Sequence, residues 1–352
     1  MTRRLLALVM LLALAGCAPL RQGPGAPAPG FPGPHLEDRA FVSFDGARLG
    51  LQHWDAPGEP WAVIIGLHGM DDHSQTFHLA APWWAGQGIT TYAYDQRGFG
   101  RSPERGVWAE RSVIDRDLET MIALARQRHP HVLIAVVGVS MGGAVAVDAF
   151  SSPDPPQADR IVLMSPAVWG WSSQPLTYRI ALWVAAHTLR GLVLKPPAFI
   201  TSKIAASDNL PELIRMGRDP LMLWGARPDA LLGLVNLMQR AWEETGQVKP
   251  PTLYAYGAHD QIVPPGPAFQ AAARLKPSDR TAHYPDGCHL LLNDLEGPLV
   301  WRDVVSFLKD PAAPLPSGAP PIPPPDNAPH EGARCIPRAP SPASGPASAP
   351  SL

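Results

Sequence analysis

The chain has 352 residues, of which 45% are hydrophobic and 17% are charged, and its formal net charge is −2. This apolar content suffices for a large core and argues against a disordered chain, and the absence of a broad basic field argues against a nucleic-acid partner. The 3 cysteines are too few and too scattered for a disulfide scaffold or a zinc cluster, so each is interpreted singly. We expect no metal and no organic cofactor.

The first 17 residues have the features of an export signal. Arg3 and Arg4 precede an apolar run over residues 5–13, which is too short for a membrane span of about 20 residues. The Leu-Ala-Gly-Cys that ends at Cys17 resembles the lipobox of bacterial lipoproteins, which implies acylation of Cys17. By the same resemblance, Ala18 favours the outer membrane, facing the periplasm. The alternative is an ordinary signal peptide that is cleaved near Ala18.

Two further segments have compositions that do not favour a packed core. Residues 18–35 consist largely of proline, glycine and alanine, which is typical of a linker. Residues 311–352 are again rich in proline, alanine and serine, so we predict a disordered tail with local polyproline II character. The candidate globular domain therefore covers residues 36–310.

Within residues 36–310, strand-like runs alternate with helix-like stretches, which is typical of an α/β fold. An opening antiparallel pair is expected at residues 41–44 and 49–54, around the Asp45-Gly46 turn. Five continuous apolar runs favour a parallel sheet covered on both faces: residues 61–67, 89–94, 132–137, 160–164 and 251–256. A short last strand is expected at residues 281–284 and a helix at 298–309. Function is expected at the carboxyl ends of these strands.

The strand at residues 132–137 leads into Gly-Val-Ser-Met-Gly at residues 138–142, followed by a helix-compatible stretch. This is the G-x-S-x-G pattern between strand and helix, in which the glycines permit a tight turn that exposes the serine. Ser140 is therefore the candidate nucleophile. The start of the helix and the backbone amide of Met141 are expected to face a developing oxyanion.

A serine nucleophile needs a base to take its proton and a carboxylate to orient that base. His289 follows the last predicted strand and Asp260 follows the strand before it, which gives the order Ser, Asp, His. His283 and His259 remain rival bases, and Asp286 remains a rival acid. The predicted catalytic residues are therefore Ser140, Asp260 and His289.

The loop after residues 61–67 reads His-Gly-Met-Asp-Asp-His-Ser from His68 onward. Gly69 lets the backbone turn, so that the amide of Met70 supplies a second oxyanion donor. His68 is interpreted as a brace for this loop and not as a catalytic group. The Asp-Asp-His at residues 71–73 has no partner cluster elsewhere in the sequence, so it does not indicate a metal site.

Five segments together resemble the monoacylglycerol lipase and lysophospholipase branch of the α/β-hydrolase superfamily, also called the serine aminopeptidase S33 type. They are His68-Gly69, residues 94–102, 138–142 and 257–264, and Gly287-Cys288-His289. The resemblance covers about residues 41–308. It implies the triad Ser140, Asp260 and His289 with oxyanion donors at Met70 and Met141, and it implies a structural role for the loop at residues 95–102.

The resemblance also implies that the helical, tryptophan-bearing stretch at about residues 165–250 is a cap over the active site, with an acyl-binding tunnel. We expect a serine carboxylic ester hydrolase that acts on monoacylglycerols, lysophospholipids or similar single-chain esters. The alternatives are an aminopeptidase-like hydrolase, because nothing in the cap sequence excludes it, and a non-catalytic envelope lipoprotein. A protein partner for the tail at residues 311–352 is also left open.

Overall fold

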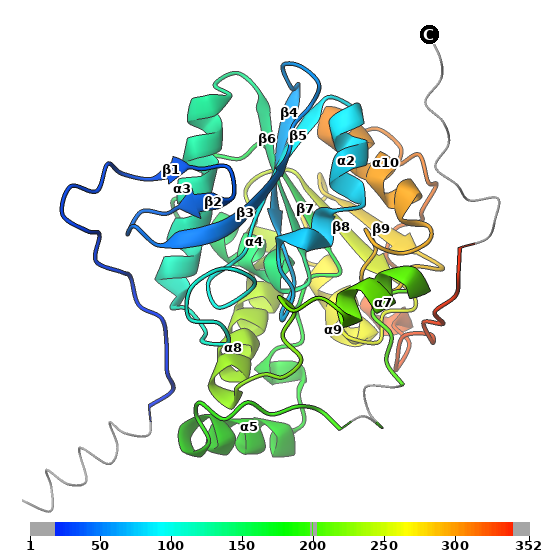
Figure 1. Ribbon diagram of the computed structural model, residues 1–352. Coiled ribbons are helices and arrows are strands. Elements are labelled where there is room, and N and C mark those ends of the chain that lie inside the picture. Colours follow the sequence, from blue (N-terminus) through cyan, green and yellow to red (C-terminus); the bar gives the residue numbers. More distant parts are fainter. Residues whose placement is uncertain (1–17, 198, 200–202, 341–352) are drawn as a thin grey trace, which may run out of the picture.

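The computed structural model describes residues 18–197, 199 and 203–340 (Figure 1). The predicted export signal and Cys17 therefore lie outside the described residues, as does the end of the tail from residue 341 onward. Within the described ranges, every helix is too short or too polar to serve as a membrane span.

A nine-stranded sheet forms the centre of the described residues, in the order β1-β2-β3-β5-β4-β6-β7-β8-β9. The first pairings, from β1 to β3 and from β3 to β5, are antiparallel, and all the others are parallel. The strands are β1 His35–Leu36, β2 Ala40–Val42, β3 Arg48–Trp54, β4 Ala62–Leu67, β5 Ile89–Tyr94, β6 Leu133–Val139, β7 Arg160–Met164, β8 Thr252–Gly257 and β9 Arg280–Tyr284. The predicted mostly parallel sheet is confirmed.

Helices cover both faces of the sheet, as the continuous apolar strands require. Side chains of β4 alternate between two cores: Val63 and Ile65 pack with the helices α3, α4, α8 and α9, whereas Ile64 packs with α2 and α10. The helices are α2 Ala80–Gly86, α3 Arg111–Arg128, α4 Met141–Ser151, α5 Leu176–Thr188, α7 Leu210–Gly217, α8 Pro228–Glu244, α9 Pro265–Ala272 and α10 Gly297–Lys309.

The insertion between β7 and β8 contains α5, α7 and α8 and forms the cap. The helix α8 packs on α4 and is fixed there by the ion pair between Arg240 and Asp148, 2.9 Å apart. The helix α5 packs on α8 and lies at the lower end of the molecule, away from the sheet (Figure 1). The cap is thus layered, with its outermost helix remote from the central sheet.

The start of the described chain is more ordered than a plain linker would be. The side-chain amide of Gln22 is buried and donates to the carbonyl of Val107 at 2.7 Å, and Glu110 N–H donates to the Gln22 carbonyl at 2.9 Å. Gly25 N–H donates to Asp45 Oδ2 at 2.6 Å. Because these polar groups pair with the domain, residues 22–25 are docked on it and do not act as a free spacer.

The prediction of a disordered tail is wrong for residues 311–340. Ser317 N–H donates to Asp303 Oδ1 at 2.8 Å, and the Pro320 carbonyl accepts from His283 N–H at 2.8 Å, so the tail pairs with α10 and with the outer edge of β9. The interpretation of each cysteine singly is also wrong, because Cys288 and Cys335 form a disulfide. A proline residue lacks the backbone N–H but keeps a carbonyl that accepts hydrogen bonds. A proline-rich segment can therefore be held in place by the domain it contacts, and its composition alone does not predict whether it is ordered or disordered.

Candidate active site

Ser140 occupies the tight turn between β6 and α4. Its backbone is strained, with φ 51° and ψ −113°, in a region that residues other than glycine rarely adopt. The flanking glycines are required by space: a Cβ on Gly138 would lie 2.4 Å from the Gly142 carbonyl oxygen, and a Cβ on Gly142 would lie 2.2 Å from the Leu67 carbonyl oxygen. The Ser140 N–H donates to the Met164 carbonyl at 2.9 Å, which fixes the turn to β7.

Asp260 and His289 are brought together from the loops after β8 and β9. His289 Nδ1 lies 2.8 Å from Asp260 Oδ2, and both side chains are buried. The other oxygen, Oδ1, accepts from the backbone N–H groups of Ile262 and Val263 at 2.8 and 2.9 Å. This carboxylate is held on both sides, so it fixes the ring of His289 with the proton on Nδ1 and leaves Nε2 to accept a proton.

The rival acid and bases lie elsewhere. Asp286 is exposed and makes no side-chain hydrogen bond among the described residues. His283 stacks on Tyr256 and packs edge-on against Phe269, and burial lowers the pKa of its ring. His259, like His283, does not line the cavity that contains Ser140. The geometry therefore favours Asp260 and His289 over each alternative.

Two backbone amides beside Ser140 are available for an oxyanion. A Cβ on Gly69 would lie 3.3 Å from Ser140 Cβ, so the loop after β4 passes directly over the serine. Within the described residues, the N–H groups of Met70 and Met141 donate to no other protein group. Free amides on two sides of the nucleophile are the arrangement that stabilises a tetrahedral oxyanion.

His68 braces this loop, in agreement with its interpretation from the sequence. It is fully buried, its Nε2 accepts from Gln96 N–H at 2.9 Å, and the Gln96 side chain donates to the His68 carbonyl at 2.8 Å. Burial lowers the pKa of the imidazole and keeps it neutral. Asp95, at the end of β5, accepts from Ser74 N–H and Arg101 N–H, each at 2.8 Å, so the loop that follows β5 supports the one that follows β4.

The acidic residues of the loop after β4 have partners inside the protein, with one exception. Asp72 accepts from the Thr76 hydroxyl at 2.6 Å, and His73 Nε2 lies 3.0 Å from Asp219. Asp71 has a left-handed backbone with φ 64°, and its buried Oδ1 has no partner among the described residues. Burial, with the charge of Asp72, raises the pKa of Asp71 to about 7. In the part of the chain that the structure describes, no three His, Cys, Asp or Glu side chains gather as metal ligands.

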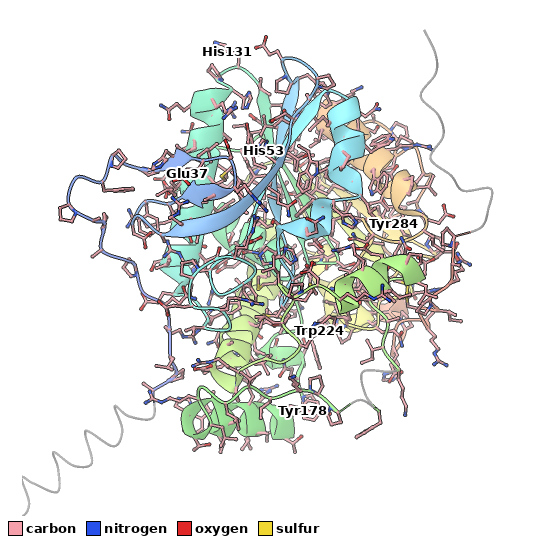
Figure 2. The ribbon with its side chains drawn as sticks, viewed as in Figure 1. Glu37, His53, His131, Tyr178, Trp224 and Tyr284 are labelled. Atoms are coloured by element: carbon pink, nitrogen blue, oxygen red, sulfur yellow. A yellow bond between two sulfur atoms is a disulfide. The ribbon has the colours of Figure 1, made fainter. Side chains whose placement is uncertain are left out.

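Ser140 and His289 open into one cavity of about 1440 Å³ between the sheet and the cap. Its walls are mostly apolar and come from the cap, for example Leu182, Trp224 and Met238. Figure 2 shows Trp224 and Tyr178 on the cap side of the molecule. The tail also contributes, through residues 334–337, and sequence reasoning missed this wall. The sequence did contain a signal for it. Once Cys17 is assigned to the export signal, Cys288 and Cys335 remain, and a disulfide between them would bring the tail next to His289.

Comparison with known proteins places these motifs in a family. The family model described as serine aminopeptidase, S33 matches residues 58–296. The chain belongs to this family. The matched residues include Ser140, Asp260 and His289.

Curated relatives and solved structures agree with this placement. The chain is 27% identical to a monoacylglycerol lipase of Mycolicibacterium smegmatis, over 77% of this chain and 96% of that protein. It is 27% identical to the monoglyceride lipase of Homo sapiens, over 74% and 84% of the two chains. The monoacylglycerol lipase of Paleococcus ferrophilus superposes with a TM-score of 0.61 at 24% identity, covering 74% of this chain and 98% of that one.

A monoglyceride lipase of Saccharomyces cerevisiae superposes with a TM-score of 0.64 at 17% identity, over 81% of this chain and 98% of that one. Similarity at this identity shows the fold, which is the α/β-hydrolase fold with a cap, as predicted. Together with the family match, it identifies the protein as a hydrolase, and the prediction of an enzyme is confirmed.

Proposed function

We propose that the protein is a serine esterase that cleaves single-chain lipid esters, such as monoacylglycerols or lysophospholipids, through an acyl-serine intermediate. The observation that carries the proposal is the common cavity: Ser140 and His289 open into the same large, mostly apolar space beneath the cap. An apolar cavity with few polar groups near the nucleophile suits an acyl chain that ends in an ester.

In this mechanism the Oγ of Ser140 attacks the ester carbonyl while His289 takes the hydroxyl proton. The tetrahedral oxyanion accepts hydrogen bonds from the amides of Met70 and Met141. Collapse breaks the bond to the alcohol, which leaves with the proton from His289. Water then attacks the acyl-serine with the same base, releasing the fatty acid and restoring Ser140. Asp260 keeps the ring of His289 oriented and stabilises its positive charge.

The names of the relatives support the substrate class, since proteins from a bacterium and a mammal that cover most of this chain are described as monoacylglycerol or monoglyceride lipases. The aminopeptidase alternative has one observation in its favour. The unpartnered carboxyl of Asp71 lines the cavity, where an ionised carboxylate would pair with a substrate amine.

A substrate series distinguishes the two. Each buried CH₂ contributes about 0.8 kcal/mol, so kcat/KM for monoacylglycerols below their micelle concentration is expected to rise several-fold for each added pair of methylenes until the cavity is full. Aminoacyl arylamides of similar size are expected to give no turnover. Flat ester rates together with rapid arylamide release would favour the aminopeptidase.

We further propose that the protein is anchored to the bacterial envelope through acylated Cys17, on the periplasmic side of the outer membrane. Two features support this placement. The Cys288–Cys335 disulfide suits an oxidising compartment. The helix α5 exposes apolar side chains suited to a lipid surface, namely Leu176, Tyr178, Ile180, Trp183 and Val184.

Metabolic labelling with a fatty acid tests the anchor. We expect label in the wild-type protein and none in Cys17→Ser, which remains unprocessed or is released in soluble form. Label that persists in Cys17→Ser would contradict the lipobox assignment.

A further inference from the structure

The tail leaves α10 and follows the edge of the sheet before it turns back toward the active site. The strap, defined as residues 311–340, begins with the contacts of Ser317 to Asp303 and continues along β9, where Ile322 N–H donates to Thr281 Oγ1 at 3.0 Å. β9 is the last strand of the sheet on this side. The strap therefore covers an edge of the sheet that would otherwise be open. Beyond β9 it turns back toward the active site.

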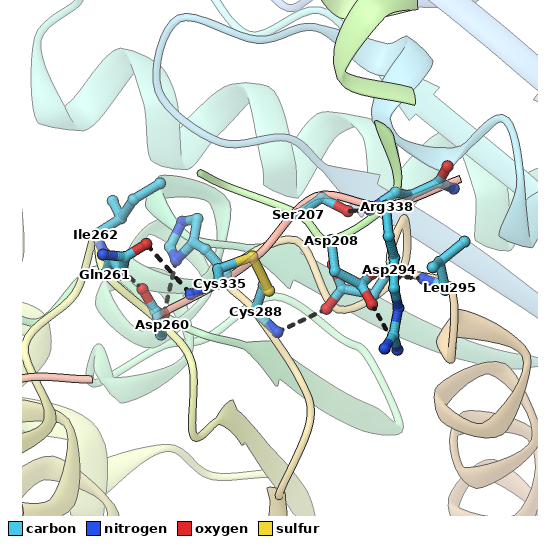
Figure 3. The surroundings of a disulfide bond; sticks show 12 residues. Ser207, Asp208, Asp260, Gln261, Ile262, Cys288, Asp294, Leu295, Cys335 and Arg338 are labelled. Carbon is cyan, nitrogen blue, oxygen red and sulfur yellow. Dashed lines mark hydrogen bonds and ion pairs between the residues drawn. A yellow bond between two sulfur atoms is a disulfide. The ribbon is translucent and has the colours of Figure 1, made fainter. Parts of the chain in front are cut away.

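The end of the strap joins the two loops that hold the acid and the base. Ala333 N–H donates to the Ala258 carbonyl at 2.9 Å, in the loop that contains Asp260. A Cβ on Gly332 would lie 2.0 Å from the Asp260 carbonyl oxygen, so the two backbones are in direct contact. Cys335 is bonded to Cys288, the residue before His289. Figure 3 shows the strap passing beside both loops at this point.

The same segment is tied to the cap and to the chain after the base. Arg338 N–H donates to the Asp208 carbonyl at 2.7 Å, and the Arg338 carbonyl accepts from Leu210 N–H at the start of α7 at 3.1 Å. The Asp208 carboxylate lies 3.4 Å from the Arg338 guanidinium and accepts from Leu295 N–H at 2.8 Å (Figure 3). Residues 332–338 thus connect the acid loop, the base loop and the cap.

Between these attachment points the strap forms part of the cavity wall. Arg334, Ile336 and Pro337 line the cavity that contains Ser140 and His289. Ile336 is 66% exposed although it is a large apolar residue, and it belongs to neither hydrophobic core. An exposed apolar side chain that lines the cavity and belongs to neither core is available to a bound substrate.

We propose that residues 332–338 of the strap position the Asp260–His289 pair and select the substrate by lining its cavity, with the Cys288–Cys335 disulfide holding both functions in place. This proposal rests on the proposed esterase function for its substrate, but its positioning part applies to any reaction of Ser140. Cys288 and Cys335 are positioning residues, and Ile336 is a residue that contacts the acyl chain.

The positioning part is tested with a fluorophosphonate, which reacts with Ser140 and needs the same base but no natural substrate. Cys288→Ser/Cys335→Ser is expected to slow phosphonylation and to lower kcat by roughly 10- to 100-fold, because small displacements of reacting groups cost about this much. Gly332→Val, which forces the strap away from Asp260 with the disulfide intact, is expected to act in the same direction. Both are compared with wild type well below their unfolding temperatures.

Ser317→Ala is the matched control. It loosens the same strap at its contact with Asp303 but does not line the cavity. Unchanged phosphonylation in this variant together with slow phosphonylation in the disulfide variant supports positioning. Equal rates in wild type, the disulfide variant and Gly332→Val would overturn the positioning part, as would an equal loss in Ser317→Ala.

The proposed role of the strap in substrate selection is tested by changing the size of Ile336 alone. For Ile336→Ala we expect KM for the longer monoacylglycerols to rise about threefold to tenfold, as expected for loss of a few buried CH₂ contacts, with kcat unchanged. Ile336→Trp should shift the preferred chain length. A chain-length profile identical to that of wild type in both variants would overturn this part.

The proposed function and the strap fail in different ways. If wild type turns over no monoacyl ester yet its Ser140 is phosphonylated faster than in the disulfide variant, the substrate assignment is wrong and the positioning role stands. If wild type hydrolyses the esters and no strap variant changes its rates, the proposed esterase function stands and the proposed role of the strap is wrong.

Discussion

The catalytic floor and the cap of this protein are built in opposite ways. In the floor, buried polar groups of the loops after β4, β5 and β8 are held by hydrogen bonds: His68 pairs with Gln96, Asp95 with two backbone amides, and Asp260 with two amides and His289. In the cap, α5 has one buried side chain, Ala186, among 13 residues. The proposed catalytic groups thus lie on hydrogen-bonded loops, whereas the outermost helix of the cap carries apolar groups that are exposed and sparsely packed.

After loss of the nucleophile itself, the largest effect expected in the floor comes from its acid. Asp260→Asn should lower kcat by about 10⁴, because an amide in place of the carboxylate holds the imidazole in the wrong tautomer. Turnover of a soluble monoacyl ester measures it. Asp286→Asn is the matched control on the other side of the last strand and should retain wild-type activity. A reversed pair of results would mean that the acid is Asp286.

Buried charge in the floor should also cost more to disturb than charge in the cap. Arg97 is buried and pairs with Asp45 and Asp117 at 2.8 and 2.6 Å, so Arg97→Ala leaves two buried carboxylates unpaired and should lower the free energy of unfolding by about 3–5 kcal/mol. Arg215→Ala breaks a pair with the buried Glu212 in α7, but Arg215 itself is 31% exposed and Glu212 keeps a second partner in His78, 3.3 Å away, so the loss should be smaller, about 1–2 kcal/mol. Denaturant unfolding compares the two, and equal losses would contradict the contrast between the regions.

Asp71 lies at the border of the two regions and should make stability depend on pH. The unfolded carboxyl ionises near 3.8, whereas burial raises the native pKa to about 7, so the native state binds more protons between these values. Stability contributed by this group therefore falls as pH rises from about 4 to about 7, by an amount on the order of 2–4 kcal/mol.

Asp71→Asn removes this dependence, and asparagine also tolerates the left-handed backbone. Unfolding midpoints at pH 5 and pH 8 should show the variant gaining on wild type at the higher pH. Asp115 and Asp294, whose pKa values are also raised to about 7, are present in both proteins and cancel in the comparison. Parallel changes in the two proteins would contradict the assignment.

The smallest effect on stability is expected at the outer surface of the cap. Trp183 is 57% exposed on α5, so Trp183→Ala should change the free energy of unfolding by less than about 0.5 kcal/mol. Partition into lipid vesicles should fall by about tenfold if this surface meets lipid. Both proteins are compared in the Cys17→Ser background, so that no acyl chain contributes. Unchanged partition would remove α5 as a lipid contact.

The same contrast explains what could be predicted from the sequence. The floor could be predicted from the sequence for two reasons. Strands buried on both faces give continuous apolar runs, and the run at residues 89–94 coincides with β5. Tight turns require glycine, and a Cβ at Gly138 or Gly142 would collide with the backbone. The positions of Ser140, Asp260 and His289 follow from the strand order, and in the structure the latter two are in contact.

The cap and the strap could not be read in the same way. With its apolar side chains exposed, α5 shows no one-sided pattern from which a helix and its packing could be derived. The strap is fixed by backbone carbonyls such as that of Pro320 and by one disulfide, and neither leaves a periodic signal in a proline-rich segment. The composition of residues 311–340 favoured disorder for this reason.

The central claim is that Ser140 becomes acylated during turnover. Wild type is mixed with an activated monoacyl ester, quenched in acid during the first turnovers and digested, and the peptide that contains Ser140 is examined by mass spectrometry. We expect the mass of the acyl group on Ser140, no such peptide from Ser140→Ala, and a loss of roughly 10⁴ to 10⁶ in kcat in that variant. An acyl group on a different residue, or sustained turnover by a folded Ser140→Ala protein, would contradict the claim.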